Sequence, residues 1–364
     1  MKSGKRLLHL SVASLIFLGG VALIVYLADP FFHYHEPWFD LKAVEDQKEY
    51  QVPGMLKNFS YDSVLAGSSV VMSVNTDTLD ARFDCETVKA VGGSASAPLL
   101  REYLEMAFEG RALRYVFYGL DVFSFYHNPD MQVIDDDVVY LINGNPFDDA
   151  AYLWNMDVIG EKVPAMLKKS RDESYSEGLL YQLNAGAVLG PDAVLKIHRP
   201  GAGAVQEMKP LDYYEAYVSE NLDRLEKMVA EHAGTQFYFF VPPYHIVWWD
   251  DAYEKGLLDA YLHTLERCMK NLLPYENVRF YKTDFNEASV ITDAYQYMDY
   301  IHGGTMVTER MARQIGAPQE EITLETCEAE IDRLREIFET FRAQVESDVA
   351  FGLNSEGSRD NMDE

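Results

Sequence analysis

Short apolar runs alternate with longer amphipathic stretches along most of the chain after residue 60. Each run is rich in β-branched or aromatic side chains, which is typical of buried parallel strands. The stretches between the runs repeat apolar positions at helical spacing. This alternation predicts an α/β fold with helices on both faces of a sheet. The predicted strands are residues 63–66, 87–91, 114–118, 236–241 and 278–281, and the clearest helices are 98–110, 212–232 and 257–273.

The N-terminus has a different pattern, because residues 7–28 contain no Asp, Glu, Lys or Arg. As a helix, this run would span about 33 Å, enough to cross a hydrocarbon core of about 30 Å. Basic residues in the preceding segment, 1–6, favour a cytoplasmic N-terminus with the remaining chain outside. We therefore expect an uncleaved, single-pass membrane anchor. A cleaved signal peptide is the alternative, but Tyr26 interrupts the small-residue pattern expected before a cleavage after Ala28.

An aromatic stretch, residues 29–39, opens the predicted juxtamembrane segment 29–57 and suits the interface of a membrane. It contains His33, His35 and Glu36, whose spacing offers a metal site as an alternative. No further ligand lies nearby in the sequence, so we favour interface anchoring and predict neither a metal nor another cofactor.

The predicted α/β domain covers residues 58–317, with an insertion at 124–210 that lacks a clear strand–helix unit. The insertion contains an acidic patch at 135–137 and a turn signal at 143–146. We expect it at the carboxyl edge of the sheet, either as a cover over substrate or as additional packing.

A C-terminal amphipathic helix is predicted at 318–350, followed by a polar tail, 351–364, that we expect to be disordered. Its apolar positions follow steps of three and four residues. This spacing fits a helix packed on its own domain, or alternatively a coiled coil that forms a homodimer. The apolar positions are Leu324, Cys327, Ile331, Leu334, Phe338, Phe341 and Val345.

Charge and cysteine content exclude several classes of function. The chain has 364 residues, with 31 Lys and Arg against 59 Asp and Glu, for a net charge of −28. That balance excludes a nucleic-acid partner, because binding requires cations that neutralise phosphates. It also argues against broad adhesion to anionic lipid. Three widely separated cysteines exclude a disulfide scaffold and a cysteine-based zinc site.

The first predicted strand ends in Gly67, Ser68 and Ser69. Ligands of open α/β sheets bind beyond the carboxyl ends of the strands, where a serine hydroxyl beside backbone amides suits nucleophilic catalysis. An ordinary turn is the alternative. After the last predicted strand, Asp299 and His302 are spaced so that the carboxylate can orient an imidazole base. A loop that caps the next helix is the alternative there.

Other strand ends carry glycine or polar residues at the same predicted edge. A glycine allows a backbone amide to approach a substrate oxygen. These candidates are Gly92 and Gly93 after the second strand, Asp121 after the third, and Tyr244 and His245 after the fourth.

Taken in order, these motifs resemble the SGNH (GDSL-like) hydrolase superfamily over roughly residues 58–317. The resemblance is greatest to its membrane-anchored branch, which includes the teichoic acid D-alanine transfer protein and the alginate O-acetylation proteins. It implies a three-layer sandwich around a mostly parallel, five-stranded, flavodoxin-like sheet. The motifs are Gly67-Ser68-Ser69, Gly92-Gly93, Gly119-x-Asp121 and Asp299-x-x-His302.

The resemblance implies a role for each motif. Ser69 matches the nucleophile, His302 the base and Asp299 its orienting acid. The oxyanion hole would use the Ser69 amide, Gly92 or Gly93, and the position of Asp121. The family usually has Asn at that last position, and an ionised Asp cannot donate a hydrogen bond. Ser68, Tyr244 and His245 are predicted to contact substrate.

We therefore expect an extracytoplasmic esterase or O-acyltransferase that acts on acyl groups of cell-envelope polysaccharides or teichoic-acid-like polymers through an acyl-serine intermediate. A non-catalytic assembly protein that serves a membrane-bound O-acyltransferase or a polymer synthase is the alternative. A polysaccharide-binding module that uses Tyr244, Trp248 and Trp249 is a third hypothesis.

Overall fold

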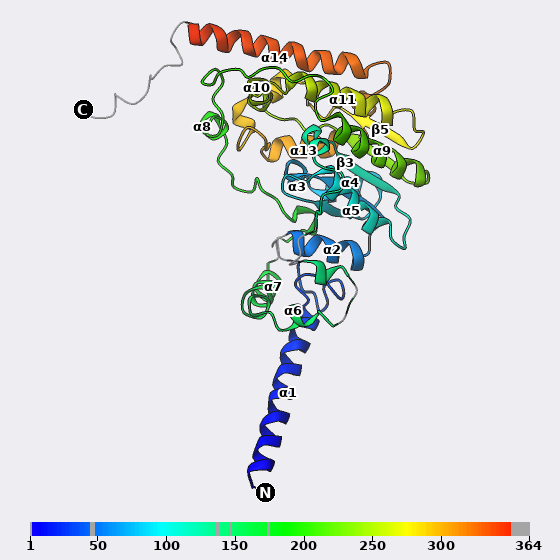
Figure 1. The fold of residues 1–364 in the computed structure, drawn as a ribbon, viewed down its shortest axis with the longest axis vertical. Helices are drawn as coiled ribbons and strands as arrows, with labels where there is room; N and C mark the ends of the chain where they lie inside the picture. The colour runs from blue at the N-terminus through cyan, green and yellow to red at the C-terminus, as the bar shows by residue number, and fades with distance from the viewer. Residues whose placement is uncertain are drawn as a thin grey trace, which may run out of the picture.

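The computed structural model describes residues 2–43, 48–134, 138–143, 145, 147–172 and 175–350. A long helix, α1 (Lys2–Ala28), projects from one end of an α/β body, and α14 (Cys327–Ala350) lies across the opposite end (Figure 1). The predicted acidic patch at 135–137, two residues of the turn signal at 143–146, and the predicted disordered tail at 351–364 lie outside the described residues.

The core of the body is a six-stranded sheet in the order β2-β1-β3-β4-β5-β6. The first five strands in this order pair in parallel, and β6 pairs antiparallel with β5. All five predicted strands are present, within one residue of their predicted ends. The strands are β1 (Ser63–Gly67), β2 (Thr87–Val91), β3 (Tyr115–Gly119), β4 (Gln236–Phe240), β5 (Val278–Tyr281) and β6 (Glu321–Ile322).

The prediction of a five-stranded sheet was wrong by one strand. The additional strand, β6, has only two residues and lies in the region predicted as helix. Ile322 pairs with Phe280 and is fully buried, so one apolar side chain secures the strand. Two residues are too few to establish a period-two pattern, so no strand could be predicted there.

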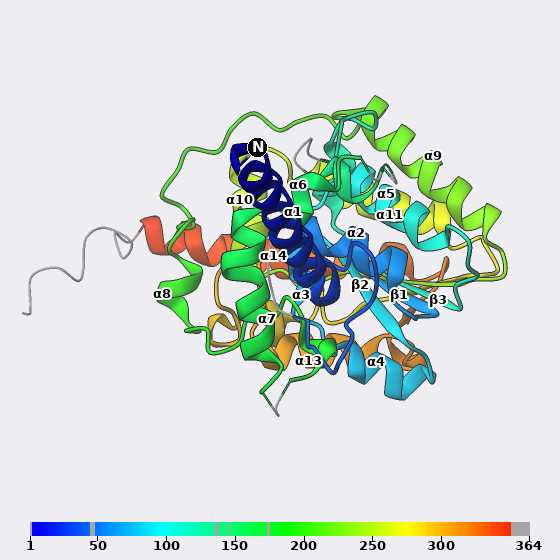
Figure 2. The same cartoon turned by 90° about the horizontal axis from the view of Figure 1, so that it is seen from below.

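Helices cover both faces of the sheet, as predicted. Figure 2 shows α5, α9 and α11 on one side of the strands and α4 and α13 on the other. The longer helices are α2 (Lys48–Asn58), α4 (Thr76–Phe83), α5 (Ala97–Phe108), α9 (Glu215–Glu231), α10 (Ile246–Glu254), α11 (Leu258–Leu272) and α13 (Thr305–Gln314). The short ones are α3 (Ser69–Met72), α6 (Ala150–Leu153), α7 (Val163–Lys169), α8 (Pro191–Val194) and α12 (Ala288–Ile291).

One helix, α1, is long and apolar enough to cross a membrane, with a mean hydropathy of 2.4 over its best window between Lys5 and Ala28. Most of its described residues are exposed. By length and composition, α1 can serve as a membrane anchor or as a signal sequence.

The end of α1 is fixed to the body by the buried carboxylate of Asp29. Its two oxygens accept hydrogen bonds from the backbone amides of His33, Tyr34 and His35, at 2.7 to 3.0 Å, and from the Tyr152 hydroxyl at 2.8 Å. These bonds turn the chain sharply after the helix, and Asp29 itself has a positive φ of 44°.

The two histidines of this segment make structural contacts. The His33 ring lies between the Leu141 carbonyl oxygen and the Asp149 carboxylate, and the His35 ring stacks on Trp38. Much of the segment expected at the membrane interface is thus buried within the protein. Its metal alternative loses support because both rings are engaged by other groups.

The described part of the insertion, 124–210, contains no strand, and its two halves pack in different regions of the fold. Its first half, with α6 and α7, lies beside α1 (Figures 1 and 2). Its second half reaches the carboxyl edge of the sheet, where the Gly190 amide donates to the Tyr297 carbonyl oxygen at 3.2 Å. The second half therefore lies near the edge expected for the insertion, whereas the first half lies beside α1.

The apolar seam of α14 packs against α10 and α11 of the same chain. Seam residues Cys327, Ile331, Leu334 and Phe338 are all buried. The packing alternative therefore accounts for the heptad spacing. A homodimer through this helix stays a prediction, and it would have to use the outer face of α14.

The packing of α14 can be tested by shortening one seam residue. Leu334→Ala should lower the free energy of unfolding by about 2–5 kcal/mol, because a fully buried leucine leaves a cavity when truncated. Leu324→Ala is the matched control, since Leu324 is about half exposed. Denaturant unfolding of the detergent-solubilised protein measures both. Equal, small effects would contradict the packing described here.

Candidate active site

Ser69, His302 and Asp299 form a continuous chain of hydrogen bonds. The Ser69 hydroxyl oxygen lies 2.8 Å from His302 Nε2, and His302 Nδ1 lies 2.7 Å from Asp299 Oδ2. The serine and the histidine are 233 residues apart in the sequence. This geometry lets the imidazole accept the hydroxyl proton while the carboxylate fixes the ring orientation.

The Asp299 carboxylate also organises the loop that carries the histidine. Its Oδ1 accepts hydrogen bonds from the backbone amides of Ile301 and His302, both at 2.7 Å. Burial alone would raise the pKa of Asp299, but the hydrogen bonds from His302 and the two amides outweigh it, so the pKa is lowered. The group is therefore ionised at neutral pH, as an orienting carboxylate must be.

Contacts from distant segments hold this loop against the sheet. The Tyr297 hydroxyl donates to the Pro243 carbonyl oxygen at 2.9 Å, and Tyr297 pairs with Gly303 in an antiparallel bridge. From the insertion, Asn184 Nδ2 donates to the Gly303 carbonyl oxygen at 3.3 Å. Sequence analysis did not identify Asn184, because nothing local marks a residue whose partner lies 119 positions away.

The nucleophile lies where β1 turns into α3. Ser68 caps this short helix, and Ser69 is its first residue. Gly67 and Gly119 leave room for Val71 at this turn, since a Cβ on either glycine would lie within 2.6 Å of a Val71 methyl group. Small residues at the ends of two adjacent strands therefore set the position of Ser69.

The two candidate glycines of the oxyanion hole differ in their surroundings. The Gly92 amide donates to the Gly67 carbonyl oxygen at 3.3 Å, and Gly92 is buried. Gly93 is exposed. Of the pair, Gly93 is therefore the one whose amide is better placed to meet a substrate oxygen, and Gly92 links the ends of β1 and β2.

Asp121 is completely buried at the end of β3, close to Ser68. The Tyr244 hydroxyl donates a hydrogen bond to its Oδ1. Its Oδ2 has no hydrogen-bond partner of good geometry among the described residues. Burial raises the pKa of Asp121 to about 6, against the lowering effects of Ser68 and Tyr244. Near neutral pH the carboxylate is thus ionised, and only its protonated form could donate to an oxyanion.

The remaining predicted contact residues are buried. Tyr244 reaches Asp121, and His245 caps α10 by accepting a hydrogen bond from the Val247 amide at 3.2 Å. Burial lowers the pKa of His245 to about 4, so this ring is neutral. Trp248 and Trp249 are also buried, which removes the basis for the sugar-stacking hypothesis. The substrate contacts predicted for Ser68, Tyr244 and His245 stay predictions.

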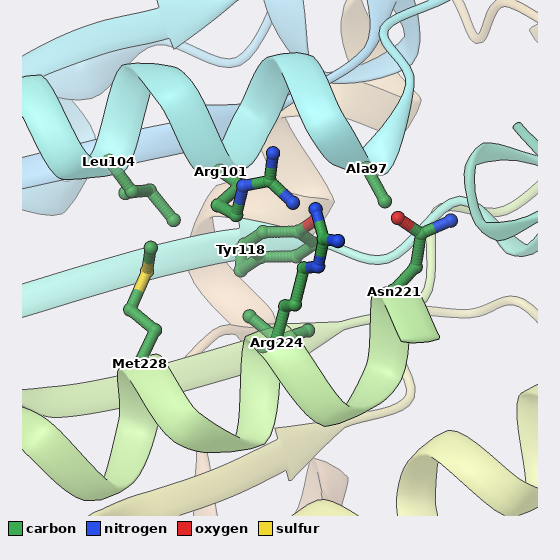
Figure 3. Close-up of a pocket in the computed structure, with 8 residues that line it drawn as sticks. Ala97, Arg101, Leu104, Tyr118, Asn221, Arg224 and Met228 are labelled. Carbon is green, nitrogen blue, oxygen red and sulfur yellow. The ribbon is translucent and has the colours of Figure 1, made fainter. Parts of the chain in front are cut away.

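A small pocket between α5 and α9 lies apart from the triad (Figure 3). It is lined by Arg101, Tyr118 and Arg224 among others, and its free volume of about 10 Å³ holds roughly one water molecule. Both arginines donate to the Pro129 carbonyl oxygen. The pocket is thus too small for an acyl group or a sugar.

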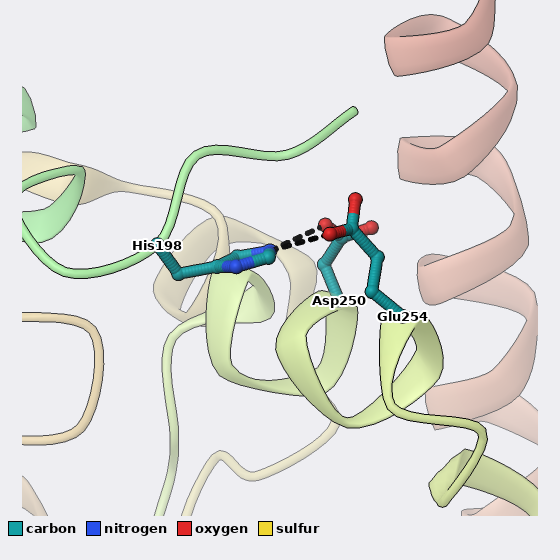
Figure 4. Close-up of side chains that lie close together, drawn as sticks. All are labelled: His198, Asp250 and Glu254. Carbon is teal, nitrogen blue, oxygen red and sulfur yellow. Dashed lines mark hydrogen bonds and ion pairs between the residues drawn. The ribbon is translucent and has the colours of Figure 1, made fainter. Parts of the chain in front are cut away.

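A second cluster of ionisable groups joins the insertion to α10 and α14 (Figure 4). His198 Nε2 lies 2.9 Å from Asp250 Oδ2, with Glu254 beside them. Arg342 on α14 contacts the same two carboxylates, at 2.8 and 3.4 Å. Burial lowers the pKa of His198, but the carboxylates raise it further, so the net shift is upward.

The donor set of this cluster resembles a metal site, but Arg342 already supplies the compensating positive charge. Glu254 Oε1 also accepts a hydrogen bond from the Gly201 amide at 3.0 Å. A divalent cation would have to displace these contacts beside a guanidinium group. We therefore assign the cluster to an ion-pair network that fastens the insertion.

Comparison with protein-family models and with curated proteins found no match for this chain.

Replacing Asp121 with asparagine should make stability less dependent on pH. Since the pKa of the folded-state carboxyl lies above the ordinary value of 3.8, its favourable contribution is complete below about pH 4 and is lost as pH rises through about 6. Asp121→Asn should therefore gain stability relative to the native protein across this window, by an amount on the order of 3 kcal/mol.

Denaturant unfolding at several pH values between 4 and 8 measures this gain. Asp332→Asn is the matched control, because Asp332 is exposed on α14 and should change little. A stability difference between Asp121→Asn and the native protein that does not vary with pH would contradict the raised pKa.

Proposed function

We propose that this chain is a membrane-anchored, extracytoplasmic serine esterase or O-acyltransferase of the SGNH (GDSL-like) type. The observation that carries the proposal is the hydrogen-bonded chain from Ser69 through His302 to Asp299. Neither alternative, an ordinary turn at Ser69 or a capping loop at 299–302, would require the serine, the histidine and the carboxylate to be hydrogen-bonded in line. Three side chains from two distant segments fulfil that arrangement here.

The proposed reaction has two steps. The Ser69 oxygen attacks an ester carbonyl while His302 Nε2 takes the hydroxyl proton and then delivers it to the departing alcohol. The resulting acyl-Ser69 is attacked by water, activated by the same imidazole, or by another hydroxyl group. Water gives hydrolysis, whereas a sugar or polyol hydroxyl gives acyl transfer.

The sheet order supports the finer fold assignment. Strands β2-β1-β3-β4-β5 are parallel in the order found in flavodoxin-like sheets, where ligands bind beyond the carboxyl ends of the strands. Ser69 follows β1, and residues 299–302 follow β5. The three-layer sandwich expected from the resemblance agrees with helices on both faces of this sheet.

An uncleaved α1 would place the catalytic body outside the cytoplasm. Lys5 and Arg6 lie at the N-terminal end of the apolar run, and they favour the cytoplasmic side. Contacts between α1 and the body support retention of the helix. Cleavage after Ala28 would remove the Tyr26 carbonyl oxygen, which lies 2.7 Å from His35 Nε2, and the Leu18 carbonyl oxygen, which accepts a hydrogen bond from Trp154.

Position within the molecule favours a polymeric substrate. In Figure 1, α3 and α13 lie well away from α1, with α2 and the α6–α7 region between them. An ester buried in a bilayer would not reach Ser69 across these elements. Acyl groups on cell-envelope polysaccharides or teichoic-acid-like polymers extend outward and fit this separation.

Labelling with a fluorophosphonate probe tests the nucleophile. The native protein should be labelled, and Ser69→Ala should lose the label completely, because the phosphonate forms its bond to the activated hydroxyl oxygen. Ser60→Ala is the matched control, since Ser60 is an exposed serine on the same polypeptide. Undiminished labelling of Ser69→Ala would overturn the assignment.

The orienting role of Asp299 provides a separate test. Asp299→Asn should slow labelling by roughly 10⁴-fold, because an amide favours the wrong imidazole tautomer. Asp332→Asn should label at the native rate. A labelling rate that is unchanged in Asp299→Asn would show that the carboxylate does not support His302.

A second candidate function is favoured by Asp121. The buried Asp121 carboxylate lies close to Ser68, and its Oδ2 has no hydrogen-bond partner of good geometry among the described residues. Such a charge opposes the negative charge of an oxyanion, and loss of one donor there commonly costs about 10²–10³ in rate. The alternative is an assembly protein that keeps the fold and partners a membrane-bound O-acyltransferase or a polymer synthase. Normal acylation of the envelope in a Ser69→Ala strain, with a defect in a null strain, would favour it.

A further inference from the structure

We propose that a surface on the insertion lies in the outer-leaflet interface of the membrane, beside α1. What we call the α6–α7 surface is defined by the exposed apolar residues of the segment 147–167, and the lipid bilayer is its partner. These residues are Phe147, Trp154, Met156 and Leu167. The inference rests on the proposed membrane anchor and adds a second, peripheral contact with lipid.

A hydrogen bond fixes the depth of this surface along α1. The Trp154 indole Nε1 donates to the Leu18 carbonyl oxygen at 3.0 Å. Leu18 lies ten residues before Ala28, which corresponds to about 15 Å along the helix. The insertion therefore extends down the side of α1, well below the point where the helix meets the body.

The part of α1 in which every residue is exposed is too short to cross a bilayer alone. Every side chain from Leu7 to Gly20 is exposed, and these 14 residues span about 21 Å. A hydrocarbon core is about 30 Å thick, so about 9 Å of the remaining helix must also lie within it. That portion of α1 contacts α6 and α7 on one side, whereas Leu23 and Ile24 are exposed on the other.

The side chains of the α6–α7 surface suit this position. Phe147 and Met156 are 90% and 76% exposed, so both apolar side chains are accessible to lipid. Trp154 has an apolar ring and a polar N–H, a combination enriched at membrane interfaces.

Charged residues in the same segment limit how deeply the α6–α7 surface can enter the bilayer. Asp157, Glu161 and Lys168 are exposed in the same segment. These groups need water or lipid headgroups, so the segment lies at the boundary between headgroups and acyl chains, as an interfacial amphipathic segment does. The net charge of −28 excludes broad adhesion to anionic lipid but does not oppose this local apolar contact.

Quenching by brominated phosphatidylcholine tests the proposal with the full-length protein in vesicles. In Trp38→Phe, Trp154 is the one remaining exposed tryptophan, because Trp248 and Trp249 are buried. Bromines on the acyl chains should quench its emission, because Trp154 contacts α1 at Leu18, about 17 Å along the helix from Leu7 and within a core about 30 Å thick. The double variant Trp38→Phe/Trp154→Phe should lose this component, and adding Met156→Trp to it should restore a quenched signal.

Two outcomes would overturn the proposal. Quenching of Trp154 by aqueous iodide without quenching by brominated lipid would place the surface in water. Protection from both quenchers would show that protein covers it. Extraction with alkaline carbonate tests the membrane anchor independently of the lipid contact. Release of the protein from the vesicles would contradict the anchor. Retention of the protein with an unquenched Trp154 would contradict only the lipid contact.

Discussion

Parallel pairing of β1 through β5 is the constraint from which the candidate site follows. Strands that run in one direction end at one edge, so loops that are distant in the sequence meet there. Ser69 leaves β1 at this edge, and the loop that carries His302 follows β5. The Asp299 carboxylate then converts a flexible loop into a fixed one, because it binds two backbone amides and the imidazole together.

At the same edge, the Asp121 carboxylate would repel the negative charge of an oxyanion. Asp121 is buried within reach of Ser68, in a position where a hydrogen-bond donor would aid catalysis. Tyr244 satisfies one of its oxygens, and the other has no sound partner among the described residues. Burial of the carboxylate costs stability and raises its pKa, so its protonation state decides whether it can donate a hydrogen bond. An enzyme would use the neutral form, whereas an assembly protein would tolerate the ionised one.

Much of the sheet and the triad could be predicted from the sequence, because both depend on local signals. Five apolar runs marked the parallel strands, and Gly67-Ser68-Ser69 and Asp299-x-x-His302 marked strand ends. Strand β6 was missed because two residues carry no period. The support from Asn184 and the contact of Trp154 with α1 were missed because they join segments more than 100 residues apart. The heptads of α14 could not reveal whether the partner was α11 or a second chain.

The Asp29 junction has a consequence for where the protein can act. A flexible linker would let a catalytic body sweep through a volume of the envelope. Here the chain turns directly from α1 into hydrogen bonds with Tyr152 and the following backbone, with no free tether between them. With α1 as the proposed anchor, this junction would hold the body at a set height and orientation above the bilayer. Substrates would then be selected partly by their distance from the membrane, because only polymer segments at that height meet Ser69.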